Sequence, residues 1–268
     1  MKPIEAATCV DGWLQACNYL LEQEHDNWRA YNVILEIADP IALPPEDRKV
    51  FTILDRFLTD RGGSPINTVV NTIFPAQLYM RHGAEGVYER YVSEIYPQVK
   101  KHPDCSWGTY AHRILCRTDA DGNKMCPLKD LVEKLGVQLK MKGPNRAVYE
   151  LGIVDPFLDI PIYDPRHDRT RPIGGPCLSH VSFKLTRDSR LMLTALYRSH
   201  WYVQRALGNL FGLAHLQYFV AKETGLELGP LVCVSSMALL DVKGSMWGKP
   251  AVRDLIKGCR HAWQPLAA

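Results

Sequence analysis

The chain has 268 residues, of which 46% are hydrophobic and 23% are charged, and its formal net charge is +3 at pH 7. This composition is typical of a globular protein with enough residues for a large core. The small net charge, and the lack of a basic run interleaved with aromatic residues, argue against a nucleic-acid-binding protein. No uncharged apolar stretch approaches the about 18 residues of a membrane span, and the N-terminus lacks the apolar core of a signal peptide. We therefore expect a cytoplasmic protein with no membrane partner.

The eight cysteines form no disulfide framework, since no C-x-x-C pair is present. Cys105, Cys116 and Cys126 could gather around a metal ion with His102 and His112, but their spacing matches no common zinc site. Reduced and mostly buried thiols are the better interpretation. We expect no metal site.

Helical and extended patterns are mixed along the whole chain. Apolar spacing predicts helices at residues 11–22, 50–58, 87–95, 128–135 and 203–224, and strands at 32–37, 147–153, 181–185 and 191–197. The helix at 128–135 is expected to end at Gly136, and Gly208 and Gly212 predict a close backbone contact on the helix at 203–224. The sequence thus predicts a single α+β domain over residues 1–268, built on a large mixed β-sheet flanked by helices.

Residues 155–171 form a polar loop that is longer than typical connections and leads towards Cys177. The loop is either a rim over the thiol or a solvated surface segment. Cys177 follows Gly-Gly-Pro directly, and the strand at 191–197 ends at Arg198 and Ser199. We therefore expect a thiol and a guanidinium at the ends of two adjoining strands.

These motifs resemble thymidylate synthase and its pyrimidine hydroxymethylase relatives. The matching segments are Pro-Cys at 176–177, Arg-Ser at 198–199, Asn209 and T-G-L-E-L-G-P-L-V at 224–232. The similarity extends more weakly upstream to about residue 65 and is not traced through residues 1–64. It implies a thymidylate-synthase-like fold, a homodimer, a pyrimidine nucleotide as substrate and 5,10-methylenetetrahydrofolate as one-carbon donor.

The resemblance also implies a role for each matching residue. Cys177 would be the nucleophile that adds to C6 of the pyrimidine, which requires a thiolate with a lowered pKa. Arg198 and Ser199 would bind the 5′-phosphate, and Asn209 would read a uracil-type base. Without the resemblance, a packed structural cysteine at a turn is the better interpretation of Cys177. The alternatives for Arg198 and Asn209 are a strand-end ion pair and a helix amide that caps a loop.

Two further residues match less closely. Arg146 aligns with one of two family arginines that reach across the dimer axis into the partner's phosphate site, and Ala147 replaces the other. Tyr110, in W-G-T-Y, resembles a family tyrosine near the thiol that helps proton transfer.

The sequence departs from the family at other positions. Asn71 or Thr72 stands where the family has its catalytic Glu, and Trp201 replaces the Asp that contacts folate. The segment that grips the sugar becomes Met237, Leu239 and Asp241. Proton handling would then fall to Tyr110, His180 or Asp241.

The sequence as a whole predicts a C5 one-carbon transferase that makes a methylated or hydroxymethylated pyrimidine nucleoside monophosphate. One alternative is a non-catalytic nucleotide-binding protein that kept the phosphate site. Another is a related enzyme of specialised nucleoside metabolism with a different substrate or donor.

Overall fold

The computed structural model describes residues 2–101, 108–118, 121–154 and 176–263. The predicted loop at 155–171, together with Cys105 and His102, lies outside the described residues. Two of the described strands, β3 (Arg117–Thr118) and β4 (Lys124–Met125), form a small hairpin of their own.

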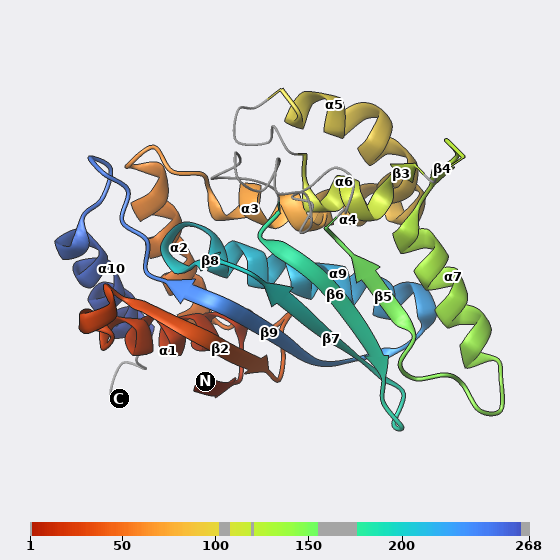
Figure 1. Ribbon diagram of the computed structural model, residues 1–268, viewed down its shortest axis with the longest axis horizontal. Coiled ribbons are helices and arrows are strands. Elements are labelled where there is room, and N and C mark those ends of the chain that lie inside the picture. The colour runs from red at the N-terminus through yellow and green to blue at the C-terminus, as the bar shows by residue number, and fades with distance from the viewer. Residues whose placement is uncertain (1, 102–107, 119–120, 155–175, 264–268) are drawn as a thin grey trace, which may run out of the picture.

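A seven-stranded sheet organises the rest of the chain (Figure 1). Its strands are β1 (Lys2–Ala6), β2 (Arg29–Ile37), β5 (Tyr149–Gly152), β6 (Leu178–Leu185), β7 (Arg190–Tyr197), β8 (His200–Trp201) and β9 (Glu227–Leu239). The spatial order is β1-β2-β9-β7-β6-β5, and β8 pairs with the end of β9. Because β9 is antiparallel to β2 and parallel to β7, the sheet is mixed, as predicted.

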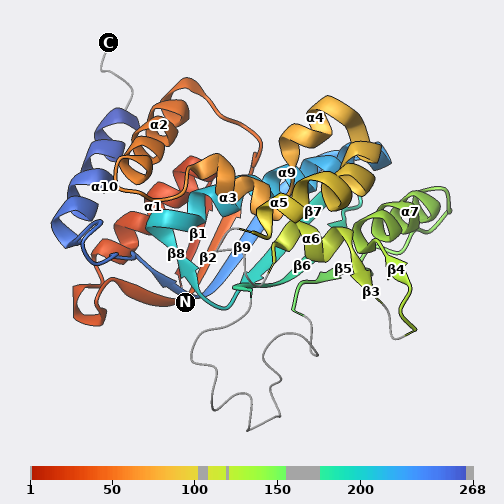
Figure 2. The same ribbon diagram turned by 90° about the horizontal axis from the view of Figure 1, so that it is seen from above.

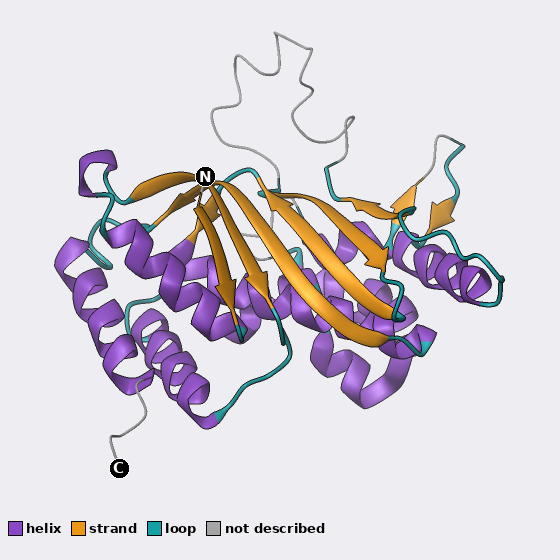
Figure 3. Cartoon of the chain, turned by 90° about the horizontal axis from the view of Figure 1, so that it is seen from below, coloured by secondary structure: helices purple, strands orange, loops and turns teal. Residues whose placement is uncertain are grey.

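Helices pack against one face of this sheet, as Figures 2 and 3 show. The α-helices are α1 (Cys9–Leu21), α2 (Pro45–Thr59), α3 (Ile66–Ile73), α4 (Ala76–Glu85), α5 (Tyr96–Val99), α6 (Tyr110–Leu115), α7 (Pro127–Leu139), α9 (Leu207–Thr224) and α10 (Lys249–Trp263). The short 3-10 helix η1 (Glu24–Asp26) and the π-helices η2 (Gly86–Ile95) and η4 (Tyr202–Ala206) complete the set. None of the helices in the described ranges is both long and apolar enough to cross a membrane.

Helix α9 is buried on nearly every side, which explains its lack of an amphipathic pattern. It packs tightly on α3: a Cβ built on Gly208 would lie 2.7 Å from the Cβ of Val69, and one on Gly212 would lie 2.8 Å from the Cβ of Ile73. The predicted close contact along these two glycines is therefore confirmed. The helix ends at Gly225, whose φ of 71° is the left-handed conformation that glycine adopts without strain.

The helical segment made of η4 and α9 runs from Tyr202 to Thr224, within one residue of the predicted helix at 203–224. One other predicted helix boundary is wrong. Helix α7 does not end at Gly136 but continues to Leu139, because buried Leu131 and Leu135 hold it on the core. A glycine inside a helix costs only about 1 kcal/mol, which such packing outweighs.

The face of the sheet opposite the helices carries several partly exposed side chains. We call it the open face and define it by Tyr31, Ile34, Leu196, Trp201 and Val234. Alternation along the strands places these residues there, since their neighbours Ala30, Val33, Leu35, Ala195, His200 and Ser235 are buried under the helices. Tyr31 is 55% exposed and Trp201 46% exposed, so the open face offers large apolar side chains to solvent.

Candidate active site

Cys177 and Arg198 lie opposite each other where the β6–β7 hairpin opens. The backbone N–H of Arg198 donates to the carbonyl of Cys177 at 2.9 Å, and Arg198 Nε donates to the carbonyl of Pro176 at 3.1 Å. Ser199 follows in the turn that leads into β8. The hairpin therefore places the thiol and the guanidinium together, as the strand pattern predicted.

The electrostatics of the thiol differ from the prediction. Burial raises the pKa of Cys177 above its ordinary value, although the positive charges of Arg198 and Arg205 act to lower it. The expectation of a lowered pKa is therefore wrong for this arrangement, because desolvation outweighs two guanidinium groups. Arg205 was missed as a site residue although it lies in the predicted helix at 203–224, because its approach to Cys177 depends on how η4 packs beside the hairpin.

Tyr110 holds the first residues of β6. Its hydroxyl accepts hydrogen bonds from the backbone N–H groups of Cys177, at 3.2 Å, and Leu178, at 3.4 Å. The side chain of Thr109 caps the start of α6 by accepting from the N–H of His112, which fixes where Tyr110 begins that helix. Burial raises the pKa of Tyr110 to about 12, so its hydroxyl stays protonated near neutral pH.

Asn209 belongs to a buried chain of hydrogen bonds behind the hairpin. Its Nδ2 lies 3.0 Å from His200 Nε2, and His200 Nδ1 lies 2.9 Å from the hydroxyl of Ser235. Burial lowers the pKa of His200 to about 3, so the ring is neutral. With the amide N–H as donor, Nε2 accepts and the proton of the ring sits on Nδ1, towards Ser235.

The ring of His200 also connects this chain to the thiol. It stacks on Tyr197 with ring centroids 4.0 Å apart, and Tyr197 pairs with Leu178, the neighbour of Cys177. Asn209 thus has an amide oriented by His200, and its link to the thiol runs indirectly through Tyr197 and the β6–β7 pair. In the described structure, the side-chain amide of Asn209 hydrogen-bonds to His200.

Arg146 lies away from this group within one chain. Its carbonyl accepts from the N–H of Leu185 at 3.0 Å, and its guanidinium donates to the carbonyl of Thr186. Both contacts are at the end of β6 opposite Cys177. A strand of eight residues is about 25 Å long, which is too far for one arginine side chain to span.

The other proton-handling candidates are engaged elsewhere. His180 Nε2 lies 2.7 Å from a carboxylate oxygen of Glu150 on β5. Asn71 and Thr72 hydrogen-bond back to their own helix, to the carbonyls of Asn67 at 2.9 Å and Val69 at 2.7 Å. Neither position of α3 supplies a carboxylate. Of the proposed proton-handling residues, Tyr110 is the one that hydrogen-bonds to Cys177.

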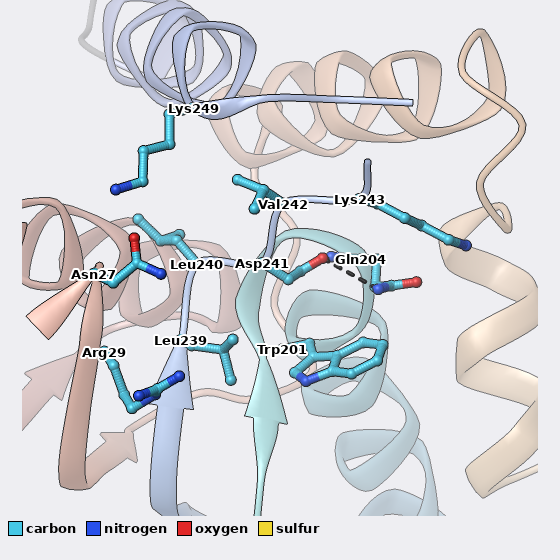
Figure 4. A pocket seen from close by; sticks show the side chains of 10 residues that line it. All are labelled: Asn27, Arg29, Trp201, Gln204, Leu239, Leu240, Asp241, Val242, Lys243 and Lys249. Carbon is cyan, nitrogen blue, oxygen red and sulfur yellow. Dashed lines mark hydrogen bonds between the residues drawn. The ribbon is translucent and has the colours of Figure 1, made fainter. Parts of the chain in front are cut away.

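Asp241 and Trp201, which replace family residues, line a pocket beside η4. The Asp241 carboxylate accepts from the N–H of Val203 at 2.9 Å and from Gln204 Nε2 at 3.2 Å, so it caps η4. Burial raises its pKa. Trp201 thus places an indole where the resemblance expects the acidic folate contact, and Asp241, which replaces a sugar contact, is already engaged by η4 (Figure 4). These residues do not fit 5,10-methylenetetrahydrofolate in the way that the resemblance implies.

Within the described part of the chain, no three His, Cys, Asp or Glu side chains gather as a metal site would require. The described cysteines, Cys177 among them, are free thiols.

Comparison with known proteins supports the resemblance over part of the chain. No model of a protein family matches it. A protein of Methanothermobacter thermautotrophicus named "Putative thymidylate synthase" is 42% identical over 76 residues, which are 28% of this chain and 33% of that protein. Proteins of the same name from Methanosarcina mazei and Methanococcoides burtonii are 40% identical over 83 residues and 32% identical over 99 residues. These matches cover 31% and 37% of this chain, and 36% and 41% of the two relatives. The chain thus spans between a third and two fifths of the curated relatives that it matches, and over that part it is similar to proteins named for thymidylate synthesis.

Proposed function

We propose that this protein is a thymidylate-synthase-like transferase that adds a one-carbon group to C5 of a pyrimidine nucleoside monophosphate. The observation that carries the proposal is the meeting of Cys177, Arg198 and Tyr110. Asn209 is linked to them through the stacked rings of His200 and Tyr197. The partial similarity to curated proteins named for thymidylate synthesis supports the same reaction class.

The proposed chemistry begins at the thiol. The Cys177 thiolate adds to C6, so that a sulfur–carbon bond forms and the C5–C6 π electrons move towards the C4 carbonyl as an enolate. C5 then attacks a one-carbon electrophile and afterwards loses its proton, and expulsion of the thiolate restores the double bond. Transfer at the level of a hydroxymethyl group is redox-neutral, whereas a methyl product needs two further electrons from the donor.

Because burial raises the pKa of Cys177, the free protein holds mostly the thiol at neutral pH. Arg198 and Arg205 favour the thiolate, and either can stabilise it once a substrate excludes water from the cluster. Tyr110, which stays protonated and whose hydroxyl lies 3.2 Å from the backbone nitrogen of Cys177, would act as a proton donor.

Binding of the nucleotide falls to the remaining residues. Arg198 and Ser199 would hold the 5′-phosphate, since a guanidinium and a hydroxyl supply several donors to its oxygens. Asn209 would pair with the base, and its amide is already oriented by His200, 3.0 Å away. An oriented amide needs no reorganisation when the base enters, which favours selective binding.

We further propose a homodimer formed through the open face. Stable association needs a broad apolar surface, and Tyr31, Ile34, Leu196, Trp201 and Val234 provide large side chains there. Arg146, at the far end of β6 from its own Cys177, would then serve the partner's phosphate site. We place the enzyme in the cytoplasm, as its sequence composition suggests.

The proposal is tested with a uridine or deoxyuridine monophosphate that carries tritium at C5. Mass spectrometry should find a Cys177-dependent covalent adduct, and tritium should be released when a one-carbon donor is present. Cys177→Ser is expected to abolish both signals, whereas Cys116→Ser, at the half-buried cysteine that directly follows α6, should abolish neither.

The second candidate is a nucleotide-binding protein without turnover, which the missing carboxylate at Asn71 and Thr72 favours. An adduct without tritium release, across folates and a broad nucleotide panel, would support this candidate. If neither nucleotide binding nor an adduct is detected, both candidates are wrong.

A further inference from the structure

The β3–β4 hairpin connects the end of α6 to the start of α7 (Figure 2). Its register pairs Arg117 of β3 with Met125 of β4. The next pair outward is Cys116, which directly precedes β3, and Cys126, which directly follows β4. The antiparallel register therefore sets two cysteines opposite each other at the base of the hairpin.

Both cysteines have the backbone conformation that such a pairing requires. Cys116 has φ −148° and ψ 115°, and Cys126 has φ −116° and ψ 90°, so each residue continues the extended strand beside it. Residues directly opposite in an antiparallel pair have Cα atoms about 4.5–5.5 Å apart and side chains on the same face. A disulfide needs Cα atoms about 4.4–6.8 Å apart, so the register suits a Cys116–Cys126 bond.

The two neighbouring helices hold the pair in place. The backbone N–H of Cys116 donates to the carbonyl of His112 in α6 at 2.8 Å, and the carbonyl of Cys126 accepts from the N–H of Asp130 in α7 at 3.0 Å. Each cysteine is thus fixed at a helix terminus. Joining two residues that are already ordered costs little conformational entropy, which favours a bond between them.

Both thiols are accessible to a small reagent. Cys116 and Cys126 are half-buried free thiols, as is Cys177, whereas the remaining four described cysteines are buried. Within the described ranges, no third His, Cys, Asp or Glu joins the pair as a metal site would require. The pair is therefore suited to a bond between its own two sulfurs.

We propose that Cys116 and Cys126 form a reversible disulfide by exchange with a small-molecule disulfide such as oxidised glutathione. The thiolate of one cysteine attacks the small disulfide, breaks its S–S bond and releases one thiolate, which leaves a mixed disulfide on the protein. The thiolate of the other cysteine attacks the protein sulfur of that mixed disulfide and releases the second thiolate. The two cysteines thus lose two electrons and two protons, and the small disulfide is reduced to two thiols.

The disulfide would tie the helix that carries Tyr110 to α7. Tyr110 is the first residue of α6 and hydrogen-bonds to the main chain of Cys177, and Cys116 directly follows the last residue of that helix. A reducing compartment keeps the pair open, and oxidising conditions close it. Because the Cys177 thiol takes no part in the bond, this proposal and the proposed transferase function can fail separately.

Equilibration with mixtures of reduced and oxidised glutathione tests the proposal on the unaltered chain. Burial raises the pKa of Cys126, so the exchange is run at about pH 8, where more thiolate is present. Free thiols are then blocked with iodoacetamide, and the protein is digested without reduction and mapped by mass spectrometry. The expected product is a pair of peptides joined between Cys116 and Cys126, with Cys177 outside the bond.

The same mixtures in urea supply the reference, because a flexible chain brings two cysteines together at only a millimolar effective concentration. If the fold positions the pair, the equilibrium constant for closing the disulfide should be at least about tenfold larger in the folded protein than in urea. Equal constants would mean that the fold does not position the two thiols.

A shifted pair is the matched control for the register. Met125→Cys combined with Cys126→Ser moves the thiol by one residue, to the position opposite Arg117. Because side chains alternate along a strand, this thiol points to the other face from Cys116. Its closing constant in the folded protein should fall to the value measured for the unaltered chain in urea, and circular dichroism checks that the variant folds.

Three results would overturn the proposal. The first is no Cys116–Cys126 bond in the folded protein, whether the two cysteines carry glutathione separately or pair with Cys177. The second is a closing constant no larger in the folded protein than in urea, and the third is equal closing by the shifted pair. The first two measurements use the unaltered chain, so they decide the matter even if the shifted variant does not fold.

Discussion

The hydroxyl of Tyr110 lies 3.2 Å from the backbone nitrogen of Cys177 and accepts its hydrogen bond. One side chain of α6 thereby fixes the start of β6, where the thiol is carried. The same oxygen also accepts from Leu178, so two N–H groups of the strand depend on it.

Tyr110→Phe is expected to lower the free energy of unfolding by about 1–3 kcal/mol, because it leaves both N–H groups without their acceptor. Urea unfolding monitored by circular dichroism measures the change. The control is Tyr218→Phe, at a partly exposed tyrosine of α9. Equal stability of the two variants would show that the Tyr110 hydroxyl does not hold β6.

Arg198→Met is expected to slow alkylation of Cys177 by iodoacetamide about tenfold near neutral pH. Loss of the guanidinium removes a charge that lowers the pKa of the thiol, so less thiolate is present at a given pH. Peptide mapping across a pH series measures the rate. Arg187→Met, at an exposed arginine of the β6–β7 turn, should leave the rate unchanged, and a similar slowing there would rule out a local effect.

His200→Phe tests the buried hydrogen-bond chain through its pH dependence. The pKa of His200 is about 3 in the folded protein and about 6.5 when unfolded, so its stabilising effect is complete above pH 6.5 and is lost progressively as the pH falls towards 3. Between pH 7 and pH 5 this residue should cost the unaltered protein about 2 kcal/mol of unfolding free energy, and the variant should not show that loss.

The variant itself should be about 1–3 kcal/mol less stable at pH 7, because Asn209 and Ser235 lose a partner. Urea unfolding at both pH values gives the comparison, with His25→Phe, at an exposed histidine, as control. Parallel losses in the unaltered protein and in His200→Phe would contradict a neutral, buried His200.

Two glycine variants test the contact of α9 with α3. Gly208→Ala should destabilise the protein by about 1–3 kcal/mol, since the new Cβ would lie 2.7 Å from the Cβ of Val69 and 3.0 Å from the carbonyl of Ile66. Gly136→Ala, where nothing lies within 4 Å, should instead stabilise helix α7 by up to about 1 kcal/mol. Thermal or urea unfolding measures both, and the same sign of change in both variants would contradict the packing described.

Mixing Arg146→Ala subunits with Cys177→Ser subunits tests the shared site of the proposed dimer. Each mixed dimer would keep one site with both residues, so random exchange should restore about a quarter of the activity of the unaltered protein. Activity is read as tritium release, and size measurements on tagged subunits confirm the exchange. Mixtures as inactive as either parent, despite proven exchange, would refute a role for Arg146 across the dimer.

The parts of the candidate site that the sequence predicted are those fixed by local pattern. Cys177 directly precedes β6 and Arg198 directly follows β7, so the two residues meet at the open end of one hairpin. The alternation of side chains along its two strands sets their register. The glycine contact of α9 was likewise predictable, since Gly208 and Gly212 are one helical turn apart.

The parts that were missed depend on distant segments. Strand β9 was not predicted, because its place between β2 and β7 is set by pairing with residues far away in the chain. The raised pKa of Cys177 follows from burial by several elements, which no local pattern contains. Arg205 lies in a helix that the sequence predicted, but its approach to the thiol follows from the packing of η4 beside the hairpin, which no local pattern contains.

The central position of β9 constrains the order in which this chain can acquire its structure. The pairs β1–β2 and β6–β7 are each complete before β9 is synthesised, and β9 is the strand that joins them. Until residue 239 has left the ribosome, the joining edges of β2 and β7 have no partner, and unpaired strand edges are the usual starting points for aggregation. Pairing between strands that are far apart in the chain is slow. The exposed edges of β2 and β7 therefore need protection from aggregation during synthesis, whatever the stability of the folded protein.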